Sequence, residues 1–410
     1  MTNIPSSALH RHVLIGMALG AALGTLVLGL IAQQKRKRDN GARRFSGVVE
    51  NVTELIGNTP LLRINSLSDL TGCEILGKCE FLNPGGSVKD RIALQIIRQA
   101  EQAKKITPHT NPRSRIFEGT SGSTGISLAF VARALGYEAE IFLPDDTATE
   151  KSELIHKMGA TVTKVRPVSI SNRLHYVNVA RDRASVQQKE GKQSLFVDQF
   201  ENQANWLTHY HTTGPEIWKQ TRGKIDAFIS GAGTGGTIAG VGNFLKSHNS
   251  KIKLVLADPP GSGLFNKVKQ GVMFSETEIE GKRRRHQMDT VVEGIGSNRL
   301  TDNIASIIYA IDDAISVTDE EAIKMSRFIL EREGLFIGSS SAVNLVAAYK
   351  FAKCSKFNGQ SGSHTQLKSI VTILCDSGQR HLSKFWSDVY LRENGFLSSF
   401  DEAKPMNLDF

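Results

Sequence analysis

The chain has 410 residues, of which 40% are hydrophobic and 22% are charged, an ordinary globular composition with room for two or three domains. The formal net charge of +9 is concentrated in two basic runs, 35–44 and 282–285, and no nucleic-acid-binding motif accompanies them, so we expect no nucleic-acid partner. The four cysteines show no C-x-x-C spacing, which argues against a zinc or dithiol redox site and favours buried free thiols.

Residues 13–32 form an apolar run without a charged residue, long enough as a helix to cross the roughly 30 Å of a bilayer core. A cleaved signal peptide fits less well, because the run is long and no A-x-A site precedes the basic cluster. The basic residues follow the run, so the positive-inside rule predicts a body that faces the cytosol. We therefore expect residues 1–44 to be a single-pass lipid-bilayer anchor with a basic linker. The mitochondrial outer membrane is the expected location, and the endoplasmic reticulum is the alternative.

The body alternates between strand-like and helix-like patterns. Short apolar runs predict strands over 73–81, 115–120, 138–144, 161–167, 194–199, 227–233, 253–259, 314–317 and 369–376. Helical periodicity predicts helices over 92–103, 125–136 and 149–159, with a surface helix and loop within 171–193 and an exposed insertion over 275–289. This alternation predicts an α/β fold with mostly parallel sheets flanked by helices, in which ligands bind at the carboxyl ends of strands.

The first chemically informative turn is NPGGSVKDR, residues 83–91, just before an apolar helix. It does not supply the Walker A spacing of a nucleotide-binding loop. Ser87 and Asp90 can form a rough capping box, which would place Lys89 in the first helical turn. The helix dipole and burial would both lower the pKa of the Lys89 amine, as a Schiff-base lysine requires. The alternative is a solvated charge at a helix start.

Two further turns join a strand to a helix. EGTSGSTGI (118–126) offers hydroxyls and backbone N–H groups that suit a carboxylate, although a Ser/Thr-rich helix cap is the alternative. SGAGTGGTIAG (230–240) offers glycines at which backbone N–H groups can approach a phosphate, and it matches the dinucleotide-binding fingerprint only loosely. An aldehyde-reactive lysine, a carboxylate site and a phosphate site together predict pyridoxal phosphate and an amino-acid substrate.

These turns, in this order, resemble the cysteine synthase family, which includes O-acetylserine sulfhydrylase and the catalytic core of cystathionine β-synthase. The likeness runs from about Val52 to Ser387 and includes the segments 56–64, 83–91, 120–126, 212–218, 232–237, 292–296 and 374–383. It implies the two-domain pyridoxal-phosphate fold type II, similar to tryptophan synthase β, and a homodimer. The expected large domain comprises 45–82 and 203–400, the smaller mobile substrate domain 83–202, and the tail 401–410.

The resemblance also implies residue roles. Lys89 matches the lysine that holds the cofactor and later moves the α-proton, and Ser377 matches the serine that faces the pyridine nitrogen. The phosphate loop is implied to comprise Gly233, Thr234, Gly235, Gly236 and Thr237, and the substrate carboxylate site Thr120, Ser121, Thr124 and Gln199. The family usually has asparagine where this chain has Ser123, so the contact with the cofactor's ring oxygen is lost or bridged by water.

The implied activity is β-replacement, in which O-acetyl-L-serine and sulfide give L-cysteine through an aminoacrylate intermediate. Cystathionine β-synthase-like activity, serine deamination and a membrane-tethered pseudoenzyme remain open. The absence of a haem-binding extension argues against a full cystathionine synthase. The segment 171–193 and the basic insertion are atypical of the family and are expected to reshape the entrance of the site.

Overall fold

The computed structural model describes residues 47–274, 290–354, 367–396 and 408. The predicted transmembrane helix over 13–32, the insertion 275–289 and all of the tail 401–410 except Leu408 lie outside these residues. Within the described part of the chain, no helix has the length and apolar character needed to cross a membrane. The chain divides into two compact units, 1–50 and 51–410, and the description below concerns the second.

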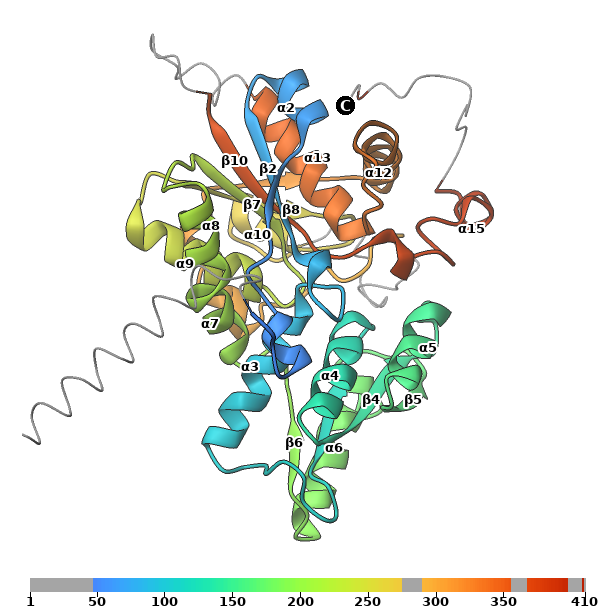
Figure 1. The fold of residues 1–410 in the computed structure, drawn as a ribbon. Helices are drawn as coiled ribbons and strands as arrows, with labels where there is room; N and C mark the ends of the chain where they lie inside the picture. The colour runs from blue at the N-terminus through green and yellow to red at the C-terminus, as the bar shows by residue number, and fades with distance from the viewer. Residues whose placement is uncertain (1–46, 275–289, 355–366, 397–407, 409–410) are drawn as a thin grey trace, which may run out of the picture. The chain divides into compact units, whose positions relative to one another are not determined.

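Two sheets form the framework of this unit (Figure 1). The six-stranded sheet has the order β1-β2-β10-β7-β8-β9, and the four-stranded sheet has the order β5-β4-β3-β6. Every pair of neighbouring strands is parallel except β1 and β2. The strand bounds are β1 Leu61–Arg63, β2 Glu74–Cys79, β3 Arg115–Gly119, β4 Glu138–Pro144, β5 Thr161–Val165, β6 Ser194–Phe196, β7 Ala227–Gly231, β8 Lys253–Asp258, β9 Asp313–Ser316 and β10 Ser369–Leu374.

Helices connect most of the strands, as expected for parallel pairing. The α-helices are α2 Asn65–Thr71, α3 Lys89–Gln102, α4 Ser123–Ala134, α5 Thr149–Lys157, α6 Tyr176–Lys189, α7 Ala204–His211, α8 Thr213–Gln220, α9 Gly236–His248, α10 Leu264–Gln270, α11 Asp302–Ala305, α12 Asp319–Glu333, α13 Ser339–Lys353 and α15 Asp388–Glu393. The short 3-10 helices are η1 Val52–Leu55, η2 Glu80–Leu82, η4 Ile308–Ala310 and η5 Gly378–Arg380. The predicted α/β fold is confirmed, including the surface helix within 171–193.

Both faces of each sheet are covered, which explains why the strands read as continuous apolar runs. In β10, Ile370 and Leu374 belong to a core with α2, α12 and α13, whereas Val371 and Ile373 belong to a core with α9 and α10. This alternation is the period of two that a strand imposes on its side chains. The four-stranded sheet is covered by α3, α4 and α5 on one face and by α6 on the other. The two sheets lie in separate stretches of sequence as expected, but the domain boundaries themselves stay a prediction.

Helices α7 and α9 approach each other closely, and this contact places the N-terminus of α9. A Cβ atom on Gly236 would lie 1.9 Å from Oδ1 of Asn205, and one on Gly240 would lie 2.1 Å from the carbonyl oxygen of Trp206. Neither space can hold a side chain, so glycine is required on this face of α9. Part of the glycine pattern in 230–240 therefore reflects helix packing.

Candidate active site

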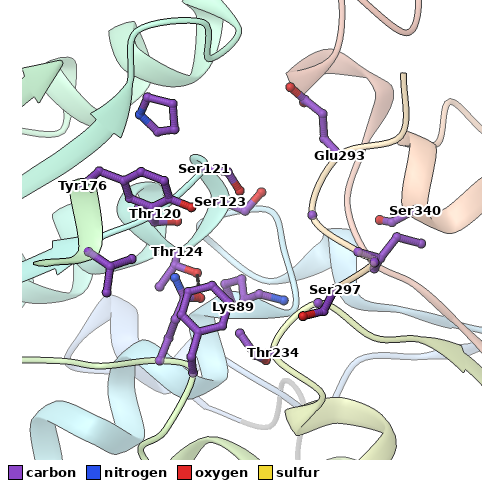
Figure 2. A pocket seen from close by; sticks show the side chains of 18 of the residues that line it. Lys89, Thr120, Ser121, Ser123, Thr124, Tyr176, Thr234, Glu293, Ser297 and Ser340 are labelled. Carbon is purple, nitrogen blue, oxygen red and sulfur yellow. Dashed lines mark hydrogen bonds between the residues drawn. The ribbon is translucent and has the colours of Figure 1, made fainter. Parts of the chain in front are cut away.

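One cavity of about 970 Å³ collects most of the residues that the sequence singles out. The predicted site residues that line it are Lys89, Thr120, Ser121, Ser123, Thr124, Gln199, Gly233 and Thr234. Figure 2 shows Lys89 extending between Thr124 and Ser297, with Thr234 below it. Three turns that are up to about 150 residues apart in sequence thus face one space, at the carboxyl ends of β3 and β7.

Lys89 is the first residue of α3, so the predicted position in the first helical turn is confirmed. The segment before it is anchored to the chain after β10, because Val88 N–H donates to the Cys375 carbonyl at 3.1 Å. The predicted capping box is wrong. The Asp90 carboxylate instead accepts from Gly85 N–H at 2.6 Å and from the Ser127 hydroxyl at 2.5 Å, which tie it to the preceding loop and to α4.

Burial lowers the pKa of the Lys89 amine, although Cys375 and Asp376 act in the opposite direction. The direction agrees with the expectation from the sequence. A lowered pKa increases the fraction of neutral amine, the form that attacks an aldehyde and that accepts a proton. The position of Lys89 therefore suits covalent and proton-transfer chemistry.

The hydroxyl-rich turn folds tightly between β3 and α4. Gly122 adopts a φ of 135°, and its N–H donates to Oγ1 of Thr120 at 3.2 Å. Thr124, in the first turn of α4, donates its hydroxyl to Oε1 of Gln199 at 2.6 Å, which joins this turn to the loop after β6. The result is a cluster of hydroxyl, amide and backbone N–H groups at a helix N-terminus, an arrangement that suits a carboxylate.

The glycine-rich turn precedes α9, a helix of 13 residues. Gly235 caps this helix with a left-handed φ of 82°. A Cβ atom on Gly233 would lie 2.2 Å from the carbonyl oxygen of Gly294, so this position holds no larger residue without moving the neighbouring loop. Oγ1 of Thr234 accepts from Nδ2 of Asn205 at 3.0 Å. Backbone N–H groups at the positive end of a helix, preceded by glycines without side chains, fit a phosphate group.

Four predicted cofactor residues do not line the cavity: Gly235, Gly236, Thr237 and Ser377. Thr237 lies 3.3 Å from Nε2 of His209, a buried histidine. Ser377 caps η5 by accepting Gln379 N–H at 3.3 Å, while its neighbours Cys375 and Asp376 do line the cavity. The roles assigned to these four residues stay predictions.

An ionic cluster at the cavity has no counterpart in the sequence prediction. Lys151, on α5 beside the four-stranded sheet, pairs with Glu293. Nδ1 of His381 lies 3.3 Å from Glu293, and its Nε2 lies 3.1 Å from Asp376. Burial opposes ionisation of Glu293, but Lys151 and His381 hold its pKa well below its usual range. Glu293 and His381 lie in the segments 292–296 and 374–383, which carry the family resemblance. The sequence therefore pointed to these segments, but it did not predict which residues pair with Glu293 and His381.

Residues 167–170 and 175–177 form another part of the wall. Figure 2 shows Tyr176 reaching toward Thr120 and Ser121. The neighbouring ring of His175 lies with its centroid 4.1 Å from that of Tyr176. Part of the atypical segment 171–193 therefore lines the site, and its expected effect on the entrance stays a prediction.

The family described as pyridoxal-phosphate dependent enzyme matches residues 52–376. The chain belongs to this family. Pyridoxal phosphate is therefore its cofactor, and membership confirms fold type II. The geometry of the cavity agrees with this cofactor, because the Lys89 amine, whose pKa is lowered, and the N-terminus of α9, which follows glycines, flank one space.

Several curated relatives cover most of this pyridoxal-phosphate dependent enzyme. "Cysteine synthase 2" of Schizosaccharomyces pombe is 46% identical over 404 residues, which are 98% of each chain. "Cysteine synthase 2" of Neurospora crassa is 53% identical over 83% of this chain and 74% of its own. "Putative mitochondrial cysteine synthase" of Saccharomyces cerevisiae is 49% identical over 90% of this chain and 91% of its own.

Proposed function

We propose that this protein is a cysteine synthase, which forms L-cysteine and acetate from O-acetyl-L-serine and sulfide. The observation that carries the proposal is the cavity in which Lys89 faces both the hydroxyl-rich turn and the glycine-rich turn. The three relatives described above are all named cysteine synthase, and none is named for cystathionine formation or deamination.

The residues divide into those that bind and those that move protons. We assign the cofactor phosphate to the N-terminus of α9 and the turn 233–237, its ring nitrogen to Ser377, and its ring oxygen side to Ser123. The substrate carboxylate is assigned to Thr120, Ser121, Thr124 and Gln199, because hydroxyl and N–H donors gather there at the start of α4.

Lys89 performs the proton transfers. Its neutral amine removes the proton from Cα of the substrate, after which acetate leaves from Cβ. Sulfide adds at Cβ, and Lys89 returns the proton to Cα. Pyridoxal phosphate, when bound, supplies the capacity to stabilise negative charge at Cα. A serine opposite the ring nitrogen would limit that capacity, which favours rapid loss of the β substituent over a long-lived charge at Cα.

The test is an assay of the purified full-length protein with three substrate sets. Cysteine from O-acetyl-L-serine and sulfide supports the proposal. Cystathionine from serine and homocysteine, or pyruvate from serine alone, in the absence of cysteine formation would replace it with one of the alternatives. If none of the three substrate sets gives a product, the pseudoenzyme is the remaining alternative. Lys89→Ala should abolish turnover, whereas Lys105→Ala, at an exposed lysine just beyond α3, should not.

We further propose that residues 13–32 anchor the protein in the mitochondrial outer membrane, with the body in the cytosol. The apolar run and the basic residues after it support this, and the Saccharomyces cerevisiae relative bears a mitochondrial name. Deleting residues 1–34 should move the protein from the carbonate-resistant membrane fraction to the supernatant with its activity retained. A truncated protein that stays with the membranes would contradict the anchor.

A homodimer, implied by the resemblance, is testable by light scattering.

A further inference from the structure

Glu118 is the first residue of the stretch 118–126, and the proposed function does not use it. It lies near the end of β3, the residue is only 1% exposed, and it does not line the cavity. Its carboxylate accepts the backbone N–H of Asp198 at 3.0 Å. It also accepts hydrogen bonds from the backbone and the side-chain amide of Gln199.

These contacts define the orientation of the Gln199 amide. Oε1 of Gln199 accepts the hydroxyl of Thr124 at 2.6 Å, a bond drawn as a dashed line at Thr124 in Figure 2. The amide nitrogen therefore faces Glu118 with one of its two N–H groups. Rotating the amide by half a turn would set its oxygen against the oxygens of Glu118. The second N–H belongs to a residue that lines the cavity and suits a carboxylate there.

The surroundings of Glu118 favour its neutral form. Burial and Asp198 raise the pKa of Glu118 to about 8, while the hydrogen bonds from Asp198 and Gln199 act in the opposite direction. The charged groups beyond it act on Asp198, and they are Arg181, Glu201 and Arg299. All the groups that donate to Glu118 are N–H groups, which the oxygens of a carboxyl group accept whether or not that group carries a proton.

We propose that Glu118 is a positioning residue that fixes the Gln199 amide with an N–H directed toward the carboxylate of the bound amino acid. The inference rests on the proposed role of Gln199 in the cysteine synthase site. It adds a buried acidic residue that touches neither substrate nor cofactor and acts through a single amide group.

The decisive variant is Glu118→Gln. Its side-chain oxygen has to face the backbone N–H of Asp198, so its new NH₂ group faces Gln199 and favours the reversed amide. Because burial already disfavours a charged Glu118, the neutral variant is expected to fold. The probe is L-alanine, which has the α-carboxylate and α-amino group of the substrate but no β leaving group. Its dissociation constant is read from the absorbance of the full-length holoenzyme.

We expect Glu118→Gln to raise the dissociation constant of L-alanine roughly tenfold, since a hydrogen bond to a charged group is lost. In a Gln199→Leu background, where no amide remains to be oriented, the same change should alter the constant by less than about twofold. An unchanged constant in the single variant, or an equal tenfold change in both backgrounds, would overturn the proposal. If Glu118→Gln does not fold, Glu118→Asp, whose carboxylate is withdrawn from the amide, is measured in the same two backgrounds against the same limits.

This test is independent of the overall reaction. A wild-type protein that forms no cysteine would remove the proposed function, and the L-alanine titration would still decide whether Glu118 acts through Gln199. Conversely, cysteine formation with additive effects of the two substitutions would keep the function and remove the role of Glu118.

Discussion

Replacing Glu216 with glutamine would remove one of two anions from a buried ionic network whose member Arg91 lies two residues beyond Lys89 in α3. Nζ of Lys78 lies 2.7 Å from Glu216, and Arg91 lies 2.8 Å from Glu80 and 2.7 Å from Glu216. The side chains of Lys78 and Glu80 are fully buried, that of Arg91 is 2% exposed, and that of Glu216 is 15% exposed.

The expected cost follows from the charge balance of these residues. Two cations face two anions, so Glu216→Gln leaves one buried cation without a counter-charge. Breaking a buried pair on one side costs about 3–5 kcal/mol. Since Glu216 is the most solvent-accessible member of the network, we expect a loss near the lower bound, about 3 kcal/mol in the free energy of unfolding.

The assay is equilibrium unfolding of the full-length protein in urea, followed by circular dichroism. The matched control is Glu138→Gln, which removes an anion from a pair with Arg115 in which the side chains are 46% and 34% exposed. That exposed pair should contribute less than about 1 kcal/mol. Equal losses in the two variants, or a loss of less than about 1 kcal/mol for Glu216→Gln, would refute the reasoning from burial.

Three further predictions concern the cavity and its wall. Gly233→Ala should weaken pyridoxal phosphate binding at least tenfold in an equilibrium titration, because the new Cβ would lie 2.2 Å from the Gly294 oxygen; unchanged affinity would contradict the tight fit. Ser123→Asn should slow cofactor release about tenfold by restoring a hydrogen bond, and an unaltered release rate would show that serine already supplies it. Burial opposes the charge on His381, but Asp376 raises its pKa above the usual 6.5. The stability that protonated His381 contributes is therefore complete below pH 6.5 and is lost as pH rises through the folded-state pKa. In His381→Gln, the melting temperature should no longer fall over this pH range. The same pH profile in the variant and the wild type would refute this role of His381.

The strands and the turns of the site were predictable because their signals are local. Continuous apolar runs predict buried parallel strands, and each turn of the site lies where such a run gives way to glycines or to serine and threonine residues. The missed strand, Leu61–Arg63, is only three residues long and pairs antiparallel with β2, so no periodicity could develop. The predicted capping box failed because the Asp90 carboxylate accepts from Gly85 and from Ser127, the second of which lies in α4, more than 30 residues away in sequence.

The residues that the sequence did not predict depend on tertiary contacts. Lys151 lies in a helix whose pattern is that of an ordinary amphipathic surface helix, and only the fold brings it to Glu293. Glu118 lies within the stretch 118–126, but its burial beside the chain that follows β6 arises from the pairing of β3 with β6. Charge pairing across elements far apart in sequence has no local periodicity from which it could be inferred.

The most direct test of the account concerns the amine of Lys89. Sodium borohydride treatment of the holoenzyme makes the link between the cofactor aldehyde and its lysine permanent, and peptide mapping by mass spectrometry then locates the added pyridoxyl mass. We expect that mass on the peptide containing Lys89. A label on another lysine, or no label on a protein that binds pyridoxal phosphate, would contradict it.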